Sequence, residues 1–114
     1  MTESLTTTTT ALAPPSPIAE WHAHLDLQVR AGQMAKDTAT TYRNGMRKFT
    51  QWASLQENWD RRLVLEWVAA LKAEGKAVKT VSIWLTGARA FFQWMLSEGR
   101  IQVDPTAGVK VGSI

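Results

Sequence analysis

The sequence of 114 residues contains no cysteine, and this absence excludes both a disulfide framework and a metal site built on thiolates. A chain without cysteine fits a reducing cytoplasm. Histidine is scarce as well, since His22 and His24 are the only two. Two residues apart on a helix, their imidazoles point in different directions, so we expect no shared metal ion.

Two kinds of segment are also missing. No run approaches the roughly 18 apolar residues that a membrane-spanning helix needs, so we expect no membrane partner. No Asn-Gly or Asp-Gly hairpin turn and no long alternating run is present, so we expect no β-strand. A glycine-rich phosphate loop between a strand and a helix is therefore excluded too.

The groups that most enzymes need are absent or misplaced. The sequence places no pair of carboxylates at helical spacing on one face, where they could share acid and base roles. The only tyrosine, Tyr42, lies among apolar residues at helical spacing, so we predict that it packs in the core. We therefore expect no catalytic residue, no metal ion and no cofactor in this chain.

What the sequence does contain is a series of amphipathic segments, separated by residues that start and end helices. These segments cover residues 16–32, 37–54, 60–75 and 78–99. We predict N-caps at Ser16, Asp37 and Asp60, and helix ends at Gly32, Gly75 and Gly99. Short connections favour neighbouring helices that are antiparallel or steeply crossed. The expected fold class is all-α, a four-helix bundle.

The two ends of the chain differ from this middle part. Residues 1–15 hold a run of threonines and little that could be buried, so we predict a disordered leader. Residues 100–114 include Pro105 and show no clear period, so we predict an irregular linker. The folded domain is then expected to span residues 16–99.

Positive charge is concentrated in the second and fourth segments. Residues 36–56 hold four cations and one anion, and residues 76–98 hold three cations and one anion. The cations of the second segment lie opposite an apolar arc that includes Gly45, so this glycine should face another helix. The fourth segment is apolar nearly all round and should be central, with one polar strip. That strip consists of Lys79, Ser82, Thr86, Arg89 and Gln93.

These basic strips leave two interpretations open. Most cationic strips on helices are solvated faces without a partner. A nucleic-acid surface is the other interpretation, because short polar side chains beside the cations can reach phosphates or base edges. Trp52 and Trp94 each follow a glutamine and could stack on bases, but packing in the core is the better interpretation.

The order of these motifs resembles one protein family. The second segment carries Thr38, Tyr42, Met46, Phe49 and Trp52 at the spacing of that family, and the third ends in "VAALKAEG". The fourth carries Thr80, Leu85, Arg89, Phe91, Phe92, Trp94, Glu98 and Gly99, and "DPTAGV" follows. Over residues 16–111 the chain resembles the N-terminal core-binding domain of tyrosine recombinases, also called phage integrases, which is a SAM-like four-helix domain.

The resemblance implies a role on DNA. In this family the domain forms half of a C-shaped clamp around a recombination core half-site, and its second and fourth helices lie across adjacent major grooves. The implied partner is double-stranded DNA, on which the full-length recombinase assembles as a tetramer, whereas we expect this fragment to be monomeric. The implied location is the bacterial cytoplasm, where a bacterial or phage-encoded recombinase associates with the nucleoid.

The implied DNA contacts follow from the matching positions of the two helices. They are Thr40, Thr41, Arg43, Asn44, Arg47, Lys76, Lys79 and Thr80, with Ser82, Thr86 and Arg89 in second rank. Many relatives carry polar or basic residues where this chain has Ile83 and Trp84. We expect weaker contact with DNA there, or contact of Ile83 with a thymine methyl group.

The resemblance also implies where the chemistry takes place. The family cleaves DNA with a nucleophilic tyrosine assisted by arginines, a lysine and a histidine or tryptophan, all in a separate C-terminal domain. Tyr42 matches the core tyrosine of the family and not that nucleophile. The alternative function is a helical protein-interaction domain in which the basic faces are solvated and an apolar patch binds a partner.

Overall fold

The computed structural model describes residues 16–54 and 58–111, and within them the chain forms helices and no strand. The helices are α1 (Pro17–Arg30), α2 (Lys36–Ala53), α3 (Arg61–Ala73) and α4 (Val78–Ser97). The expected all-α fold is therefore confirmed. The predicted disordered leader, residues 1–15, lies outside the described residues, as does the end of the predicted linker.

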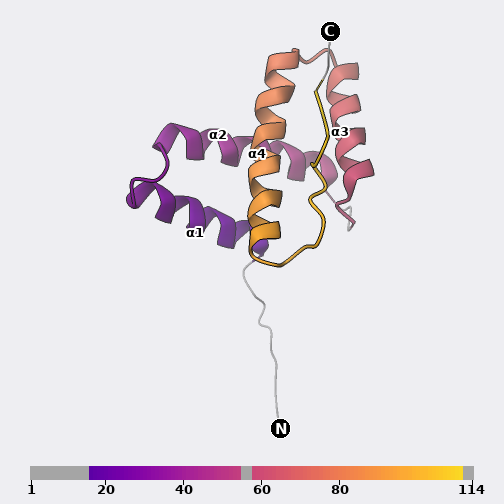
Figure 1. Ribbon diagram of the computed structural model, residues 1–114. Coiled ribbons are helices and arrows are strands. Elements are labelled where there is room, and N and C mark those ends of the chain that lie inside the picture. Colours follow the sequence, from indigo (N-terminus) through magenta and orange to yellow (C-terminus); the bar gives the residue numbers. More distant parts are fainter. Residues whose placement is uncertain (1–15, 55–57, 112–114) are drawn as a thin grey trace.

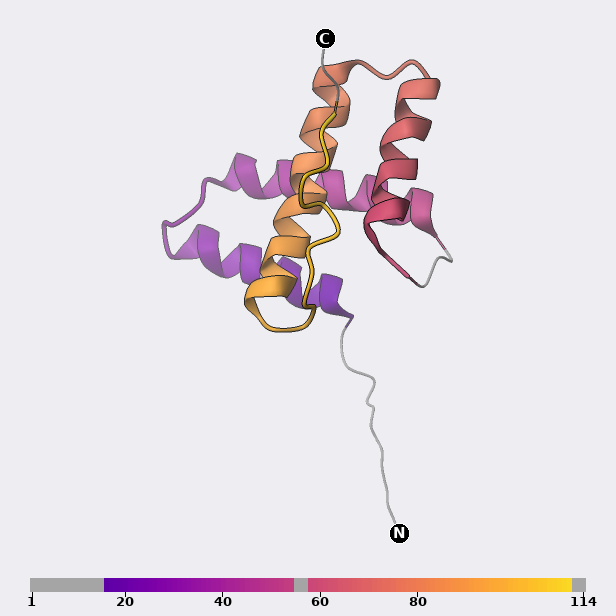
Figure 2. The same ribbon diagram turned by 45° about the vertical axis from the view of Figure 1, so that its right-hand side comes forward.

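Helix α4 occupies the centre of the arrangement. It crosses α2 steeply, and this pair has the most extensive contact in the domain. Helix α1 lies beside α2 on one side of the crossing, and α3 lies beside α4 on the other (Figure 1). After α4 the chain turns, and residues 100–111 run back along this helix toward its start (Figure 2). The central position predicted from the apolar surface of α4 is confirmed.

Local chemistry explains most of the helix boundaries. The Ser16 hydroxyl accepts a hydrogen bond from the Ala19 N–H at 3.2 Å, and the Asp60 carboxylate accepts one from the Leu63 N–H at 2.9 Å. Both predicted N-caps are confirmed, because each oxygen satisfies a backbone donor that the first helical turn leaves free. Helices α1, α3 and α4 end just before glycines at positive φ, which are Gly32, Gly75 and Gly99.

The predicted N-cap at Asp37 is wrong. Helix α2 starts at Lys36, and its N-cap is Ala35, whose backbone is extended and whose side chain has no oxygen to offer. Asp37 lies inside the first turn, where its carboxylate faces the positive end of the helix dipole without capping it. Helix α4 likewise starts after an alanine, Ala77, and has no side-chain cap.

Aromatic side chains build the core between the helices. Trp21, Phe49, Trp67 and Phe91 are all at most 1% exposed. Phe49 and Trp67 meet edge to face with ring centroids 5.1 Å apart, and Trp21 and Phe91 meet in the same way at 5.4 Å. Such pairs add about 0.5–1.5 kcal/mol beyond the burial of area. Tyr42 packs partly buried against this core, as predicted.

Two glycines allow α2 and α4 to cross at very short range. A Cβ atom placed on Gly45 would lie 2.5 Å from the carbonyl oxygen of Trp84, and one placed on Gly87 would lie 2.5 Å from that of Tyr42. Only residues without a side chain fit there. The predicted position of Gly45 against another helix is confirmed, and its partner is Gly87, which the sequence pattern did not single out.

Residues 100–111 pack against the helices although they form no regular element. Pro105, Thr106 and Val109 are buried. The Arg89 guanidinium donates hydrogen bonds to the carbonyl oxygens of Thr106 and Val109, at 3.3 Å and 2.7 Å. The described part of the predicted linker is thus held on the body of the domain, and its role as a link to a further domain stays a prediction.

Candidate nucleic-acid interface

Five of the predicted DNA contacts lie together on the exposed side of α2. Thr40 and Thr41 start this row, Asn44 and Arg47 continue it one turn later, and Arg43 flanks it. With Ile83 of α4 they line one open pocket of about 400 Å³. The helix crossing brings Ile83 into this row, because α4 passes α2 at Gly45 and Gly87. The pocket is concave, polar on the α2 side and apolar on the α4 side.

The predicted contacts of α4 form the other half of the surface. Lys79, Ser82 and Thr86 are exposed, Thr80 is half-buried, and Lys76 is exposed just before the helix. The Thr86 hydroxyl donates to the Ser82 carbonyl at 2.9 Å, as the Thr40 hydroxyl does to that of Lys36 at 3.2 Å. In both threonines the hydroxyl oxygen can still accept a hydrogen bond, while its proton is used within the helix.

The charge on this surface is largely free of internal partners. Among the residues that the structure describes, no carboxylate lies within 4.0 Å of the charged groups of Arg47, Lys76 or Lys79. Among the described residues, the Arg47 guanidinium donates only to the amide oxygen of Asn44, its neighbour one turn back on α2. These three cations can therefore meet an external anion without first breaking an ion pair.

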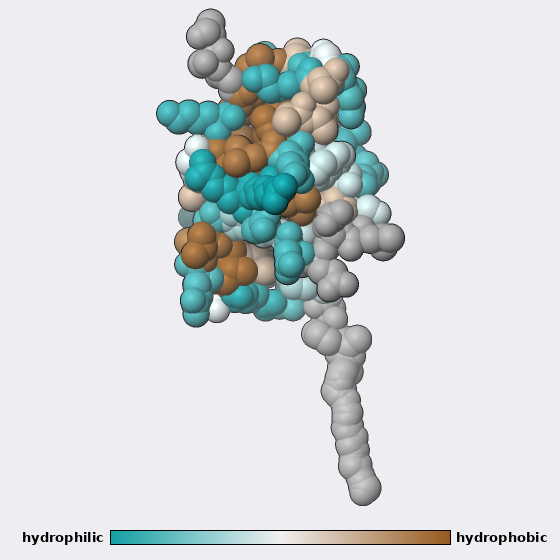
Figure 3. Space-filling model, turned by 90° about the vertical axis from the view of Figure 1, so that its right-hand side faces the viewer, coloured by the Kyte–Doolittle hydropathy of each residue, from teal (hydrophilic) through white to brown (hydrophobic). Residues whose placement is uncertain are grey.

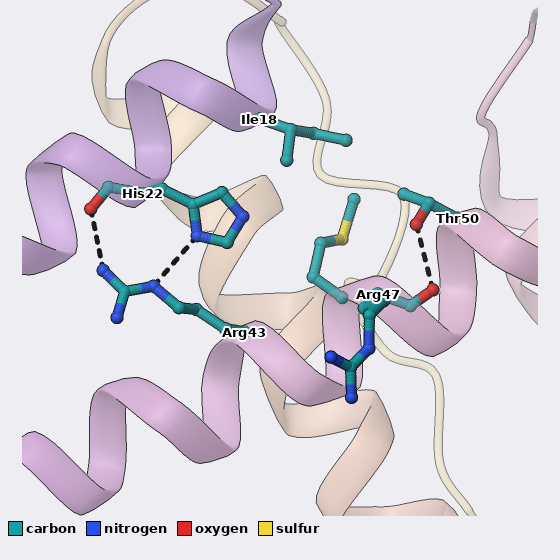
Figure 4. A pocket seen from close by; sticks show the side chains of 6 residues that line it. Ile18, His22, Arg43, Arg47 and Thr50 are labelled. Atoms are coloured by element: carbon teal, nitrogen blue, oxygen red, sulfur yellow. Dashed lines mark hydrogen bonds between the residues drawn. The ribbon is translucent and has the colours of Figure 1, made fainter.

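Arg43 is different, because its guanidinium is turned toward α1. It donates to Nδ1 of His22 at 2.9 Å and to the His22 carbonyl oxygen at 3.0 Å, and it forms an ion pair with Asp26 at 2.6 Å. Figure 4 shows Arg43 directed at His22 while Arg47 points away from it. Because its guanidinium is paired with Asp26, Arg43 is less available to an external anion than its position on the polar side of α2 predicts.

These contacts also fix the state of His22. Burial lowers the pKa of the imidazole, and the nearby Arg43 guanidinium lowers it further against a smaller opposing effect of Asp26. Because Nδ1 accepts a hydrogen bond from Arg43, the neutral ring is the form that fits. His22 and Arg43 together with Ile18, Met46, Arg47 and Thr50 line a pocket of about 310 Å³ between α1 and α2.

Arg89 is also engaged inside the molecule. Its guanidinium points to the C-terminal segment and binds the carbonyl oxygens of Thr106 and Val109. The polar strip of α4 is therefore covered by the chain itself at this position and exposed at Lys79, Ser82 and Thr86. The role of Arg89 as a DNA contact stays a prediction, and the proposed interface does not include it because its guanidinium is bound to the C-terminal segment.

The sequence pattern did not single out Lys48, and it did not show that Trp84 contacts lysines at this surface. The Lys48 ammonium lies 5.0 Å from the centroid of the Trp84 ring, and the Lys76 ammonium lies 5.9 Å from it. Lys48 is three residues after Gly45, and Trp84 is three residues before Gly87. Pairing Gly45 with Gly87 as the crossing point could have revealed this contact from the sequence, because Lys48 and Trp84 each lie about one helical turn from one of these glycines.

The described residues hold neither a cluster of metal ligands nor a helix that could span a membrane. Over residues 16–54 and 58–111, no three histidines or carboxylates are grouped so that they could hold a metal ion. In the same part of the chain, no helix has both the length and the apolar character needed to cross a membrane. The polar surface of α2 and α4 is the feature on which we base a function.

Comparison with known proteins gives a consistent result. The family model described as "Phage integrase, N-terminal SAM-like domain" matches residues 18–99. Tyrosine recombinase XerD of Pseudomonas aeruginosa is 29% identical over 80 residues, which cover 67% of this chain and 27% of that protein. Tyrosine recombinase XerC of Xanthomonas campestris pv. campestris is 27% identical over 100 residues, which cover 83% of this chain and 30% of that protein. The chain thus spans less than a third of these relatives, and no solved structure gives a significant match.

Proposed function

Since the chain belongs to the family of phage integrase N-terminal SAM-like domains, we propose that it binds duplex DNA on the joined polar faces of α2 and α4. The observation that carries this proposal is the row of Thr40, Thr41, Asn44 and Arg47 on one open pocket with Ile83. Residues from two helices that cross steeply form this single surface, and its Arg47 has no internal ion pair among the described residues.

The chemistry of the surface fits a double helix in two ways. Arg47, Lys76 and Lys79 supply positive charge for phosphate groups, which provide most of the affinity of such complexes. Thr40 and Asn44 supply short hydrogen-bonding groups that can meet base edges or phosphates. Ile83 lies beside them in the pocket, where its apolar side chain can meet the methyl group of a thymine.

The family extends the proposal to the whole recombinase. We propose that the domain is one arm of a clamp around a core half-site and positions DNA for strand exchange. A separate C-terminal domain would then hold the nucleophilic tyrosine, and four full-length protomers would assemble on the DNA. The proposed location of strand exchange is the bacterial cytoplasm, at the nucleoid. One arm alone should bind weakly, near the nonspecific range of about 10⁻⁴ to 10⁻⁶ M.

A titration of duplex DNA at about 50 mM and about 200 mM salt tests the function. The affinity should fall steeply between the two, because binding releases counterions from the phosphates. Arg47→Ala/Lys79→Ala should weaken binding with little change in melting temperature, since both side chains are exposed. The matched control is Arg30→Ala/Lys72→Ala, which removes the same charge from exposed positions at the ends of α1 and α3.

Two results would contradict the proposal. The first is the absence of binding at low salt, or binding that ignores salt. The second is an equal loss of affinity in the control variant, since that would show a response to net charge and not to this surface. Unfolding of the Arg47→Ala/Lys79→Ala variant would show instead that these residues are structural.

A protein-interaction domain is the other candidate function, and it needs a continuous apolar patch. The large exposed apolar side chains belong to different parts of the fold, among them Leu27 in α1, Leu65 in α3 and Val103 after α4. On the face that carries α3, the apolar areas are separated by hydrophilic side chains (Figure 3). This scatter favours the DNA-binding function. Chemical-shift changes on α1 or α3 with a protein partner, and none with DNA, would reverse that preference.

A further inference from the structure

Two lysines from distant parts of the chain approach the Trp84 ring at the surface. Lys48 belongs to the second half of α2, and Lys76 precedes α4. Their ammonium groups lie 5.0 Å and 5.9 Å from the centroid of the same indole ring. Both distances fall within the range in which a cation is attracted to the face of an aromatic ring. The ring itself is half-buried against the core, so it is a fixed support.

Holding two lysines at one ring costs rotamer freedom, and attraction to the ring face offsets that cost in part. The two ammonium groups that share the ring also carry the same charge. Within residues 16–54 and 58–111 neither ammonium group has a carboxylate within 4.0 Å. Each ammonium group has three donors, and contact with the ring face leaves donors for another acceptor. A bound anion would offset this like charge.

The Trp84 ring gathers cations from two separate segments of the chain. We infer that Trp84 organises Lys48 and Lys76 into one site for the phosphodiester backbone of DNA. This inference rests on the proposed function, and it adds a definite phosphate-binding site at the α2–α4 crossing. Trp84 acts as a positioning residue through the lysines, and it does not stack on a base.

The position of the site supports this assignment. A Cβ atom on Gly45 would lie 2.5 Å from the carbonyl oxygen of Trp84, so Trp84 lies at the point where α2 and α4 cross. Ile83, the preceding residue, lines the pocket with Thr40 and Asn44. Since Trp84 follows Ile83 directly on α4, the lysines at its ring lie within the width of a duplex that occupies this pocket. The same duplex can then meet both the short polar side chains of the pocket and the two ammonium groups.

Salt-dependent binding measures the site directly. Each phosphate contact that is removed should lower the slope of log affinity against log salt by about 1, so Lys48→Gln/Lys76→Gln should lower it by about 2. The affinity should fall by the same factor for two unrelated duplex sequences, because phosphates carry no sequence information. The matched control is Lys72→Gln/Lys110→Gln, which removes two exposed lysines that do not contact Trp84.

The role of Trp84 is tested by a double-mutant cycle. In a Trp84→Leu background, the two lysine substitutions should cost a smaller factor in affinity than they cost in the wild type, because the lysines are no longer held together. Trp84→Phe keeps a ring with a weaker face and should give an intermediate result. Thermal melting checks that each variant is folded, and the lysine variant alone still decides the site if Trp84→Leu fails to fold.

The outcomes separate this inference from the function on which it rests. If the wild type shows no salt-dependent binding, the proposed function fails. If the wild type binds but Lys48→Gln/Lys76→Gln keeps the full slope, only the phosphate site is wrong. If the lysines cost the same factor with tryptophan, phenylalanine and leucine at position 84, they act independently and the positioning role of Trp84 is refuted.

Discussion

The backbones of α2 and α4 meet at Gly45 and Gly87, and Gly87→Ala tests how much the fold depends on this contact. The added methyl group would lie 2.5 Å from the carbonyl oxygen of Tyr42, about 0.9 Å short of the 3.4 Å at which ordinary contact begins. It would also lie 3.0 Å from the Cα atom of Gly45 and 3.2 Å from the nitrogen of Met46. All three atoms are backbone, so no side chain can rotate away and the helices must separate.

The expected change in stability combines two opposing terms. Overpacking of this kind costs about 1–3 kcal/mol, and a clash between two helix backbones belongs at the upper end, near 3 kcal/mol. Alanine in place of glycine inside a helix returns about 0.8–1.0 kcal/mol. The free energy of unfolding should therefore fall by about 2 kcal/mol, which lowers the melting temperature of a domain of this size by roughly 8–16 °C.

Thermal melting followed by circular dichroism measures this effect, with Ser82→Ala as the control. Ser82 lies exposed on the same helix, so its replacement should leave the melting temperature unchanged or slightly raised. Gly45→Ala should behave like Gly87→Ala, and the double variant should cost less than the sum, since the first methyl group already separates the helices. A Gly87→Ala variant that melts at or above the wild-type temperature would refute the close crossing.

Further predictions concern single side chains. Because the pKa of His22 is lowered in the folded state, the unfolded chain binds more protons in acid. The contribution of His22 to the free energy of unfolding should then be constant above about pH 6.5 and fall below it. Urea denaturation at about pH 8 and about pH 5 measures this loss, which should be smaller in His22→Gln. Arg89→Ala should release the C-terminal segment, so amide hydrogen exchange at Val109 should become faster. Unchanged exchange there would show that the hydrogen bonds of Arg89 do not hold this segment. Asp60→Ala removes a true N-cap and should cost about 0.5–2 kcal/mol in urea denaturation. Asp37→Ala should cost less, about 0.3–1 kcal/mol, and the opposite order would restore Asp37 as the cap.

The helices themselves could be predicted because their signals are local. Ser16 and Asp60 reach backbone donors three residues ahead, and Gly75 ends a helix by its own backbone freedom. Such contacts span a few residues, so a sequence pattern contains both partners. The error at Asp37 has the same origin. A carboxylate in the first turn and one at the N-cap look alike in sequence, and the extended backbone of Ala35 decided between them.

The candidate site was predictable only in part. The residues from Thr40 to Arg47 were predicted from the family resemblance of one helix, and the structure places them on one pocket. Arg43 and Arg89 carry the same charge as Arg47, yet their guanidinium groups bind α1 and the C-terminal segment. Those partners are 17 to 21 residues away in sequence, beyond the reach of any helical pattern.

The sequence by itself determined four helices, the buried side of each and the two that carry excess positive charge. These properties follow from the periodicity and composition of residues that lie within one or two helical turns of each other. The tertiary structure alone decided where α2 and α4 cross, since this depends on two glycines, Gly45 and Gly87, that must meet across the chain. That crossing brings Lys48 to Trp84 and Ile83 to the α2 row. The shape and the charge of the surface proposed to bind DNA are therefore consequences of one backbone contact that no local pattern contains.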